Sequence, residues 1–152
     1  MPRIKLLEQP VYEFQYELTI QVSHLNYTGH LGHDSVVNIA HEARVHMFHA
    51  LGLAETDLGD GKAGTIIGDL VVTYSSEGHL FDKLRIESHI GELGRTNFRV
   101  FQRLTRESSL LALVETGTIA FDYKVRKIVS LPDAFRKALK RHLMTQVLNS
   151  NI

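Results

Sequence analysis

Apolar and polar residues alternate along the chain from Tyr12 to Ser23. One set of alternate positions holds Tyr12, Phe14, Tyr16, Leu18, Ile20 and Val22, and the other set is polar. Because successive side chains of a strand point to opposite faces, this pattern predicts a long strand with one buried face. A polar loop with two glycines, His24 to His33, follows the strand.

A stripe of apolar residues at helical spacing comes next. It consists of Val36, Ala40, Ala43, Met47 and Leu51. Steps of three and four residues place these side chains on one face of a helix. Asp34 or Ser35 can cap the start of this helix, and Gly52 can end it. The pattern therefore predicts one long helix directly after the first strand.

The rest of the chain predicts a loop, four strands and a second helix. The loop runs from Leu53 to Gly64, and the strands cover residues 65–74, 84–90, 96–104 and 110–123. Pro132-Asp133 opens the last helix. Since the turns between these strands are short, we expect an antiparallel meander. One helix against a curled antiparallel sheet is an α+β arrangement, and we expect residues 1–152 to form a single domain. The uncovered face and edges of such a sheet favour dimerisation.

Composition narrows the function classes. The 152 residues include 17 Lys plus Arg and 17 Asp plus Glu, so the formal net charge at pH 7 is +0. The chain therefore has no net positive charge that would attract nucleic acid. The absence of cysteine excludes disulfides and thiolate chemistry. The first residues have no long apolar region, and no run of about 18 apolar residues occurs. We therefore expect a cytoplasmic protein that does not bind membranes.

The loop and helix carry a recognisable motif. Residues 26–33 read Asn-Tyr-Thr-Gly-His-Leu-Gly-His, and Glu42-Ala43-Arg44 follows in the helix. This stretch resembles the hot-dog-fold acyl-CoA thioesterases, especially the 4-hydroxybenzoyl-CoA thioesterase group, and the resemblance covers roughly residues 11 to 127. It implies a hot-dog fold that hydrolyses an acyl-CoA to a free acid and coenzyme A, as a homodimer or a dimer of dimers. Coenzyme A is part of the substrate, and no separate cofactor is expected.

The resemblance also implies a set of site residues. Asn26 stands where the group has its catalytic Asp, and an amide is neither a base nor a nucleophile, although it can hydrogen-bond a water or the thioester oxygen. Glu42 suits a second branch of the fold, which places its carboxylate on the central helix. The catalytic set is thus Glu42, Asn26 and His33, whose backbone lies at the dipolar helix start. The expected substrate-binding residues are Gly29, His30, Asp34, Thr65, Ile67, Gly68, Arg95 and Asn97, with Thr65 to Asp69 supplied by the partner chain.

Other interpretations stay open. Glu42 can simply pair with His46 one turn along the helix, and Asn26 can simply bond its own loop backbone. The basic residues Arg95, Arg99 and Arg103 alternate with Asn97 and suit CoA phosphates, as does the stretch Lys124, Arg126 and Lys127, but a solvated sheet face explains them equally. A non-catalytic acyl-CoA-binding module is the main alternative function. A hot-dog hydratase or dehydratase is less favoured, because its Asn-Pro signature is absent.

Six of the nine histidines lie between residues 24 and 49: His24, His30, His33, His41, His46 and His49. Glu42, His46 and His49 share one helical face and raise the question of a metal. His41 and His46 are five residues apart, a rotation of about 140° around a helix, so they cannot hold one ion from one face. We therefore expect no metal.

Overall fold

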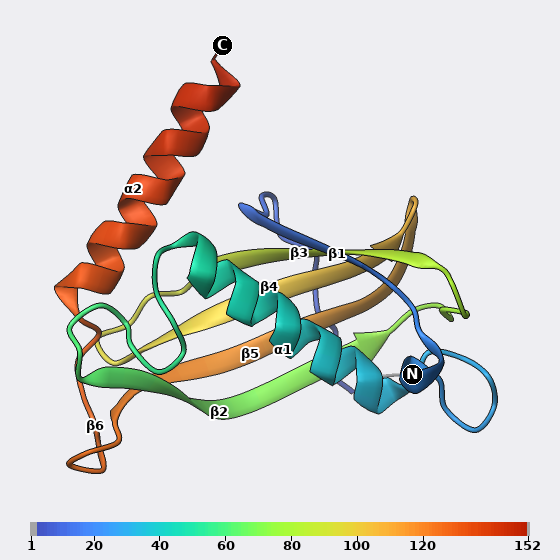
Figure 1. The fold of residues 1–152 in the computed structure, drawn as a ribbon, viewed down its shortest axis with the longest axis horizontal. Helices are drawn as coiled ribbons and strands as arrows, with labels where there is room; N and C mark the ends of the chain where they lie inside the picture. The colour runs from blue at the N-terminus through green and yellow to red at the C-terminus, as the bar shows by residue number, and fades with distance from the viewer. Residues whose placement is uncertain (1–2, 152) are drawn as a thin grey trace.

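The computed structural model describes residues 3–151, which form one curled antiparallel sheet with a helix lying on it (Figure 1). The sheet order is β1-β3-β4-β5-β2, with the short β6 paired to β5. The strands are β1 (Phe14–Thr19), β2 (Ala63–Tyr74), β3 (Lys83–Gly91), β4 (Asn97–Arg106), β5 (Ser109–Asp122) and β6 (Lys127–Ile128). The helices are α1 (His33–Ala50), α2 (Asp133–Ser150) and a 3-10 turn, Val22–His24. The α+β class is confirmed.

The strand order corrects the expected meander. Strands β3, β4 and β5 follow one another in the sheet, but β2 pairs with β5 and lies at an edge. Tyr74 at the end of β2 faces Ala112, so the chain must cross to the far side of the sheet before β3 begins. The segment 75–82 makes this crossing beside the start of α1, and it is therefore longer and more structured than the predicted turn.

The first strand is shorter than the pattern indicated. It ends at Thr19 instead of Ser23, because Val22–His24 form a 3-10 turn and the Val22 side chain is exposed. The predicted face is confirmed at Phe14 and Ile20, both of which are buried. The start of α1 also differs from the prediction. Gly32 is the N-cap, and Asp34 and Ser35 lie in the first turn.

The core lies between α1 and the inner face of the sheet, in two clusters. One cluster holds Ile20, Val36, Ile39, Ala40 and Ala43 against residues of β3, β4 and β5. The other joins the end of α1 to α2 through Phe48, Phe98 and Phe135, with the rings of Phe98 and Phe135 stacked at 4.8 Å. Burial of three large aromatic rings stabilises this end of the molecule.

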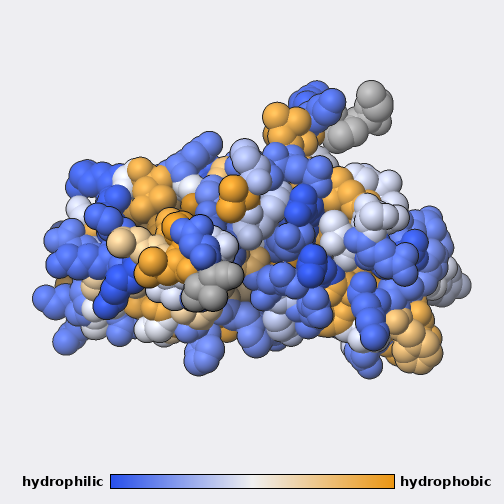
Figure 2. All heavy atoms as spheres, turned by 90° about the horizontal axis from the view of Figure 1, so that it is seen from above, coloured by the Kyte–Doolittle hydropathy of each residue, from blue (hydrophilic) through white to orange (hydrophobic). Residues whose placement is uncertain are grey.

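Helix α2 packs through its first half and projects beyond the sheet (Figure 1). Phe135, Ala138 and Leu139 are buried, whereas Met144, Val147 and Leu148 are exposed. The space-filling view of this side has apolar patches between hydrophilic side chains (Figure 2). Within residues 3–151, neither helix is long and apolar enough to cross a membrane.

Candidate active site at the start of the central helix

The loop before α1 is held by the amide of Asn26. Its Oδ1 accepts hydrogen bonds from Thr28 N (3.0 Å), Thr28 Oγ1 (2.7 Å) and His30 N (3.3 Å). Its backbone N–H donates to the His30 carbonyl, and Gly29 turns the chain with φ +85°. Asn26 therefore bonds its own loop, as one of the two interpretations predicted. Its Nδ2 group has no acceptor within the described chain and is free to donate to a substrate.

Asn26 lies directly beside the start of α1. A Cβ built on Gly32, the N-cap, would lie 3.5 Å from the Asn26 Cβ and 2.5 Å from Asp34 Oδ1. The Ser35 N–H donates to Asp34 Oδ1 at 3.0 Å, and Val36 N–H donates to the Gly32 carbonyl. Within residues 3–151, the backbone N–H groups of His33 and Asp34 have no hydrogen-bond acceptor. These two donors, at the positive end of the helix dipole, can polarise a carbonyl.

One further side chain, Tyr74 at the end of β2, completes this region. The Tyr74 hydroxyl donates to the His33 carbonyl at 3.0 Å. Partial burial raises the pKa of Tyr74, and the negative charge of Asp34 raises it further, so these two side chains are neighbours. Tyr74 was not among the site residues predicted from the sequence. Only the β2–β5 pairing, which β2's own sequence does not reveal, brings the end of β2 to the start of α1.

Glu42 is not brought to this place within one chain. Nine residues separate it from His33, which is about 13.5 Å along the helix axis. Its Oε2 lies 3.8 Å from His46 Nε2, and the His46 ring stacks on Tyr16 of β1 at 4.3 Å. Glu42 is therefore an exposed helix carboxylate on the side of α1 that faces β1.

The opposite side of α1 is tied to the loop before β2 by Glu55. Its carboxylate accepts from Arg44 Nε at 2.8 Å and lies 2.9 Å from His41 Nε2. Partial burial alone would raise the pKa of Glu55, but the hydrogen bonds from Arg44 and His41 outweigh it and hold that pKa below its ordinary value. The Glu55 carbonyl also accepts from Thr65 N and Thr65 Oγ1. Thr65 is buried, and its hydroxyl is already used.

The remaining expected binding residues lie at the other end of the sheet. Ile67 is exposed, and Gly68 sits in a bulge where an added Cβ would meet Ile119 Cδ1 at 2.7 Å. Asn97 pairs with Ile119, whereas Tyr74 pairs with Ala112, a separation of seven residues or about 23 Å along β5. In one chain, Arg95, Asn97, Thr65 and Ile67 are thus remote from Asn26 and His33.

Two of the cations expected to meet phosphates, Arg99 and Arg103, are paired with carboxylates. Arg99 bonds Asp69 Oδ2 at 2.6 Å and also Glu115, and the hydrogen bond to Asp69, together with that to Glu115, raises the pKa of Arg99. Arg103 bonds Glu87 and Glu8. Arg95 makes a 3.3 Å contact with Ser130. The solvated-face interpretation therefore fits Arg99 and Arg103.

Comparison with known proteins agrees with this architecture. The sequence model of the thioesterase-like superfamily matches residues 20–139. The chain belongs to this superfamily. A search of curated proteins gives no match. The expectation of a hot-dog-type thioester hydrolase is confirmed at the level of the family.

Solved structures share the fold at low sequence identity. A 1,4-dihydroxy-2-naphthoyl-CoA thioesterase from Synechocystis is 19% identical with TM-score 0.74, covering 82% of this chain and 93% of that one. A probable thioesterase from Bartonella henselae is 16% identical with TM-score 0.71, covering 78% and 98%. A Staphylococcus aureus protein in complex with CoA is 16% identical with TM-score 0.78, covering 90% and 87%. These likenesses confirm the hot-dog fold.

Proposed function

We propose that the protein hydrolyses an acyl-CoA thioester at the first turn of α1. The observation that carries this proposal is the pair of open N–H donors at His33 and Asp34, beside the free Nδ2 group of Asn26. A thioester carbonyl placed there meets three donors as its oxygen becomes negative. One such donor is typically worth about 3 kcal/mol in the transition state. The CoA-bound relative of the same fold supports coenzyme A as the carrier.

Two carboxylates compete for the role of base. The sequence predicts Glu42, but a thioester held by the His33 and Asp34 donors is about 13.5 Å of helix away from it. Glu42 can reach such a thioester only from a second chain. Asp34 lies in the same first turn as the donors, and only its Oδ1 is occupied, by the Ser35 N–H. The geometry favours Asp34 as the base that activates water, with no cofactor needed.

Dimerisation along β2 would complete the site. β2 is an edge strand, and its inner-facing Ile67, Leu70 and Tyr74 are 46%, 43% and 52% exposed. An exposed edge strand with apolar side chains is a natural pairing surface. If β2 pairs antiparallel with β2 of a second copy, the first half of β2 in one chain lies near the start of α1 in the other chain. The partner's strand around its β2 bulge would then flank the CoA chain, in line with the expectation that the partner supplies Thr65 to Asp69.

The alternative is a hot-dog module that binds acyl-CoA without hydrolysis. It is favoured by one observation, the occupation of Asn26 Oδ1 by its own loop, together with the amide at the position of the family's Asp. A panel of acyl-CoA thioesters, assayed by thiol release and by calorimetric binding, separates the two. Turnover of at least one thioester supports the hydrolase. Binding of an acyl-CoA without any thiol release would replace the hydrolase by the binding module.

A further inference from the structure

A cluster of three metal-ligand side chains lies beside the proposed active-site loop. His30 comes from the loop before α1, and Glu77 and His79 come from the segment that crosses from β2 to β3. A backbone hydrogen bond from Leu31 N to the Gly78 carbonyl, 2.8 Å, joins these two segments at the residues next to the cluster. The three side chains therefore project from backbone whose relative position is fixed.

Gly78 strengthens this fixation. It is buried, and a Cβ added to it would lie 2.9 Å from Ile20 Cδ1 and 3.0 Å from Leu111 Cδ2. The backbone between Glu77 and His79 is thus packed against the core, where no larger residue fits. Since the backbone is anchored, only the outer side-chain torsions of Glu77 and His79 need to adjust around a ligand.

The distances suit a small divalent ion. His30 Nε2 and His79 Nε2 lie 3.4 and 3.6 Å from the same Glu77 oxygen, Oε2. All three ligand atoms lie within 4.8 Å of one another, and the two rings meet edge to face at 5.4 Å. Ligand atoms about 2.0–2.1 Å from Zn²⁺ in a tetrahedron are about 3.3–3.4 Å apart. Two contacts are therefore close to this spacing, and a small rotation of the exposed rings closes the third.

The outer nitrogens of both rings also have partners. His79 Nδ1 lies 3.8 Å from Asp82 Oδ2, and His30 Nδ1 lies 3.4 Å from Thr28 Oγ1. A metal-binding histidine commonly has its other nitrogen oriented by a carboxylate or another acceptor. Both imidazoles are thus turned so that Nε2, and not Nδ1, faces Glu77.

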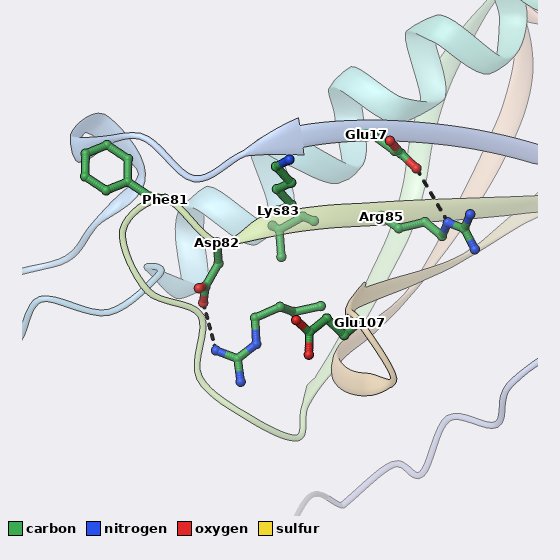
Figure 3. A pocket seen from close by; sticks show the side chains of 8 residues that line it. Glu17, Phe81, Asp82, Lys83, Arg85 and Glu107 are labelled. Atoms are coloured by element: carbon green, nitrogen blue, oxygen red, sulfur yellow. Dashed lines mark hydrogen bonds and ion pairs between the residues drawn. The ribbon is translucent and has the colours of Figure 1, made fainter.

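Asp82 is itself held in place. Its Oδ2 accepts from Arg106 Nη1 and from the His79 backbone N–H, each at 2.9 Å, at the rim of a cavity of about 580 Å³ (Figure 3). These two hydrogen bonds fix the Asp82 carboxylate on the side of His79 Nδ1, where it can orient the His79 ring.

We propose that His30, Glu77 and His79 form a binding site for a divalent transition metal of the zinc class, with a fourth position open to water. Two imidazoles and one carboxylate are a ligand set that zinc takes in proteins when it keeps an open position. The side chains are 36%, 61% and 51% exposed, so the ion can enter from solvent. This site goes beyond the proposed hydrolysis. The site does not include Glu42, His46 or His49 of α1. The expectation of no metal concerned only residues of that helix.

The test is metal binding by the full chain after chelation and dialysis. Zn²⁺ is titrated by calorimetry and Co²⁺ by its visible absorption, which becomes intense in tetrahedral coordination. We expect one equivalent to bind wild type, and at least about tenfold weaker binding after His79→Ala or Glu77→Gln. Asp82→Asn, which acts through His79, should weaken binding about tenfold or more. Circular dichroism confirms that each variant is folded, and Glu77→Gln keeps the shape of the side chain if His79→Ala does not fold.

The matched control is His46→Ala. His46 is also about half exposed and lies 3.8 Å from a glutamate, but it has no third ligand in the cluster. His46→Ala should bind the metal as wild type does. The proposal is overturned if wild type binds no ion, or if His46→Ala weakens binding as much as His79→Ala does. Because the readout contains no thioester, a failure of the metal site and a failure of the proposed hydrolysis are distinguishable.

Discussion

Glu55→Gln tests the ion pair that holds α1 to the loop before β2. The substitution keeps the size of the side chain but leaves the Arg44 guanidinium, whose side chain is 9% exposed, without its counter-charge. Breaking a fully buried pair costs about 3–5 kcal/mol, and breaking an exposed pair costs about 0.2–1 kcal/mol. The Glu55 side chain is 24% exposed and lies between these limits. We expect the free energy of unfolding at pH 7 to fall by about 2 kcal/mol.

The loss should depend on pH with a defined sign. The folded pKa of Glu55 is lowered below its unfolded value, which is about 4.3. Its contribution to stability is therefore complete above the unfolded pKa and disappears as the pH falls through the folded pKa. The difference between wild type and Glu55→Gln should thus be largest near neutral pH and shrink below about pH 4.

Urea unfolding at neutral and acidic pH measures this difference. Glu17→Gln is the matched control, because Glu17 pairs with Arg85 at 3.7 Å with both side chains more than half exposed. The control should change the unfolding free energy by less than about 1 kcal/mol. Equal losses for Glu55→Gln and Glu17→Gln, or a Glu55→Gln loss that persists unchanged at acidic pH, would refute this reasoning.

Three other changes have defined outcomes. Phe135→Ala should lower the unfolding free energy by about 3–5 kcal/mol in chemical denaturation, because this fully buried ring stacks on Phe98, whereas the exposed Val147→Ala should cost less than about 0.5 kcal/mol. Leu70→Lys should shift the protein from dimer to monomer in light scattering without unfolding it, and an unchanged mass would remove β2 as the interface. Asn26→Ala should lower kcat for thioester hydrolysis by about 100-fold, and an unchanged rate would exclude Asn26 as a donor to the reacting carbonyl.

Much of the fold was predictable from local patterns. The periods of the apolar residues predict α1, α2 and the strands, because each element buries one face. The order of strands in the sheet was not predictable in this way. β2 pairs with β5, whose partner residues lie 38 (Tyr74 to Ala112) to 59 (Ala63 to Asp122) positions later in the chain, and local patterns do not reveal such distant pairing. The predicted cap of α1, Asp34 or Ser35, was wrong: Gly32, Asp34 and Ser35 all suit a helix start, and in the structure Gly32 is the N-cap.

The candidate site was only partly predictable, for the same reason. Asn26, Gly29, His33 and Asp34 follow one another in the chain, so their proximity is local. Tyr74, Glu77 and His79 lie beside them only because the crossing segment after β2 passes the start of α1. Glu42 has the right residue type, but helix geometry separates it from the donors in one chain. Its role in catalysis stays a prediction.

The proposed function requires thioester hydrolysis at the first turn of α1. The decisive measurement is thiol release from the best acyl-CoA of the panel by wild type and by Asp34→Asn at equal concentration. Asparagine can still accept the Ser35 N–H bond but cannot act as a base. We predict that wild type turns over and that Asp34→Asn loses about 100-fold or more in kcat while still binding the substrate. Wild-type activity in Asp34→Asn, with the loss appearing instead in Glu42→Gln, would move the base to Glu42 and contradict the site proposed for one chain.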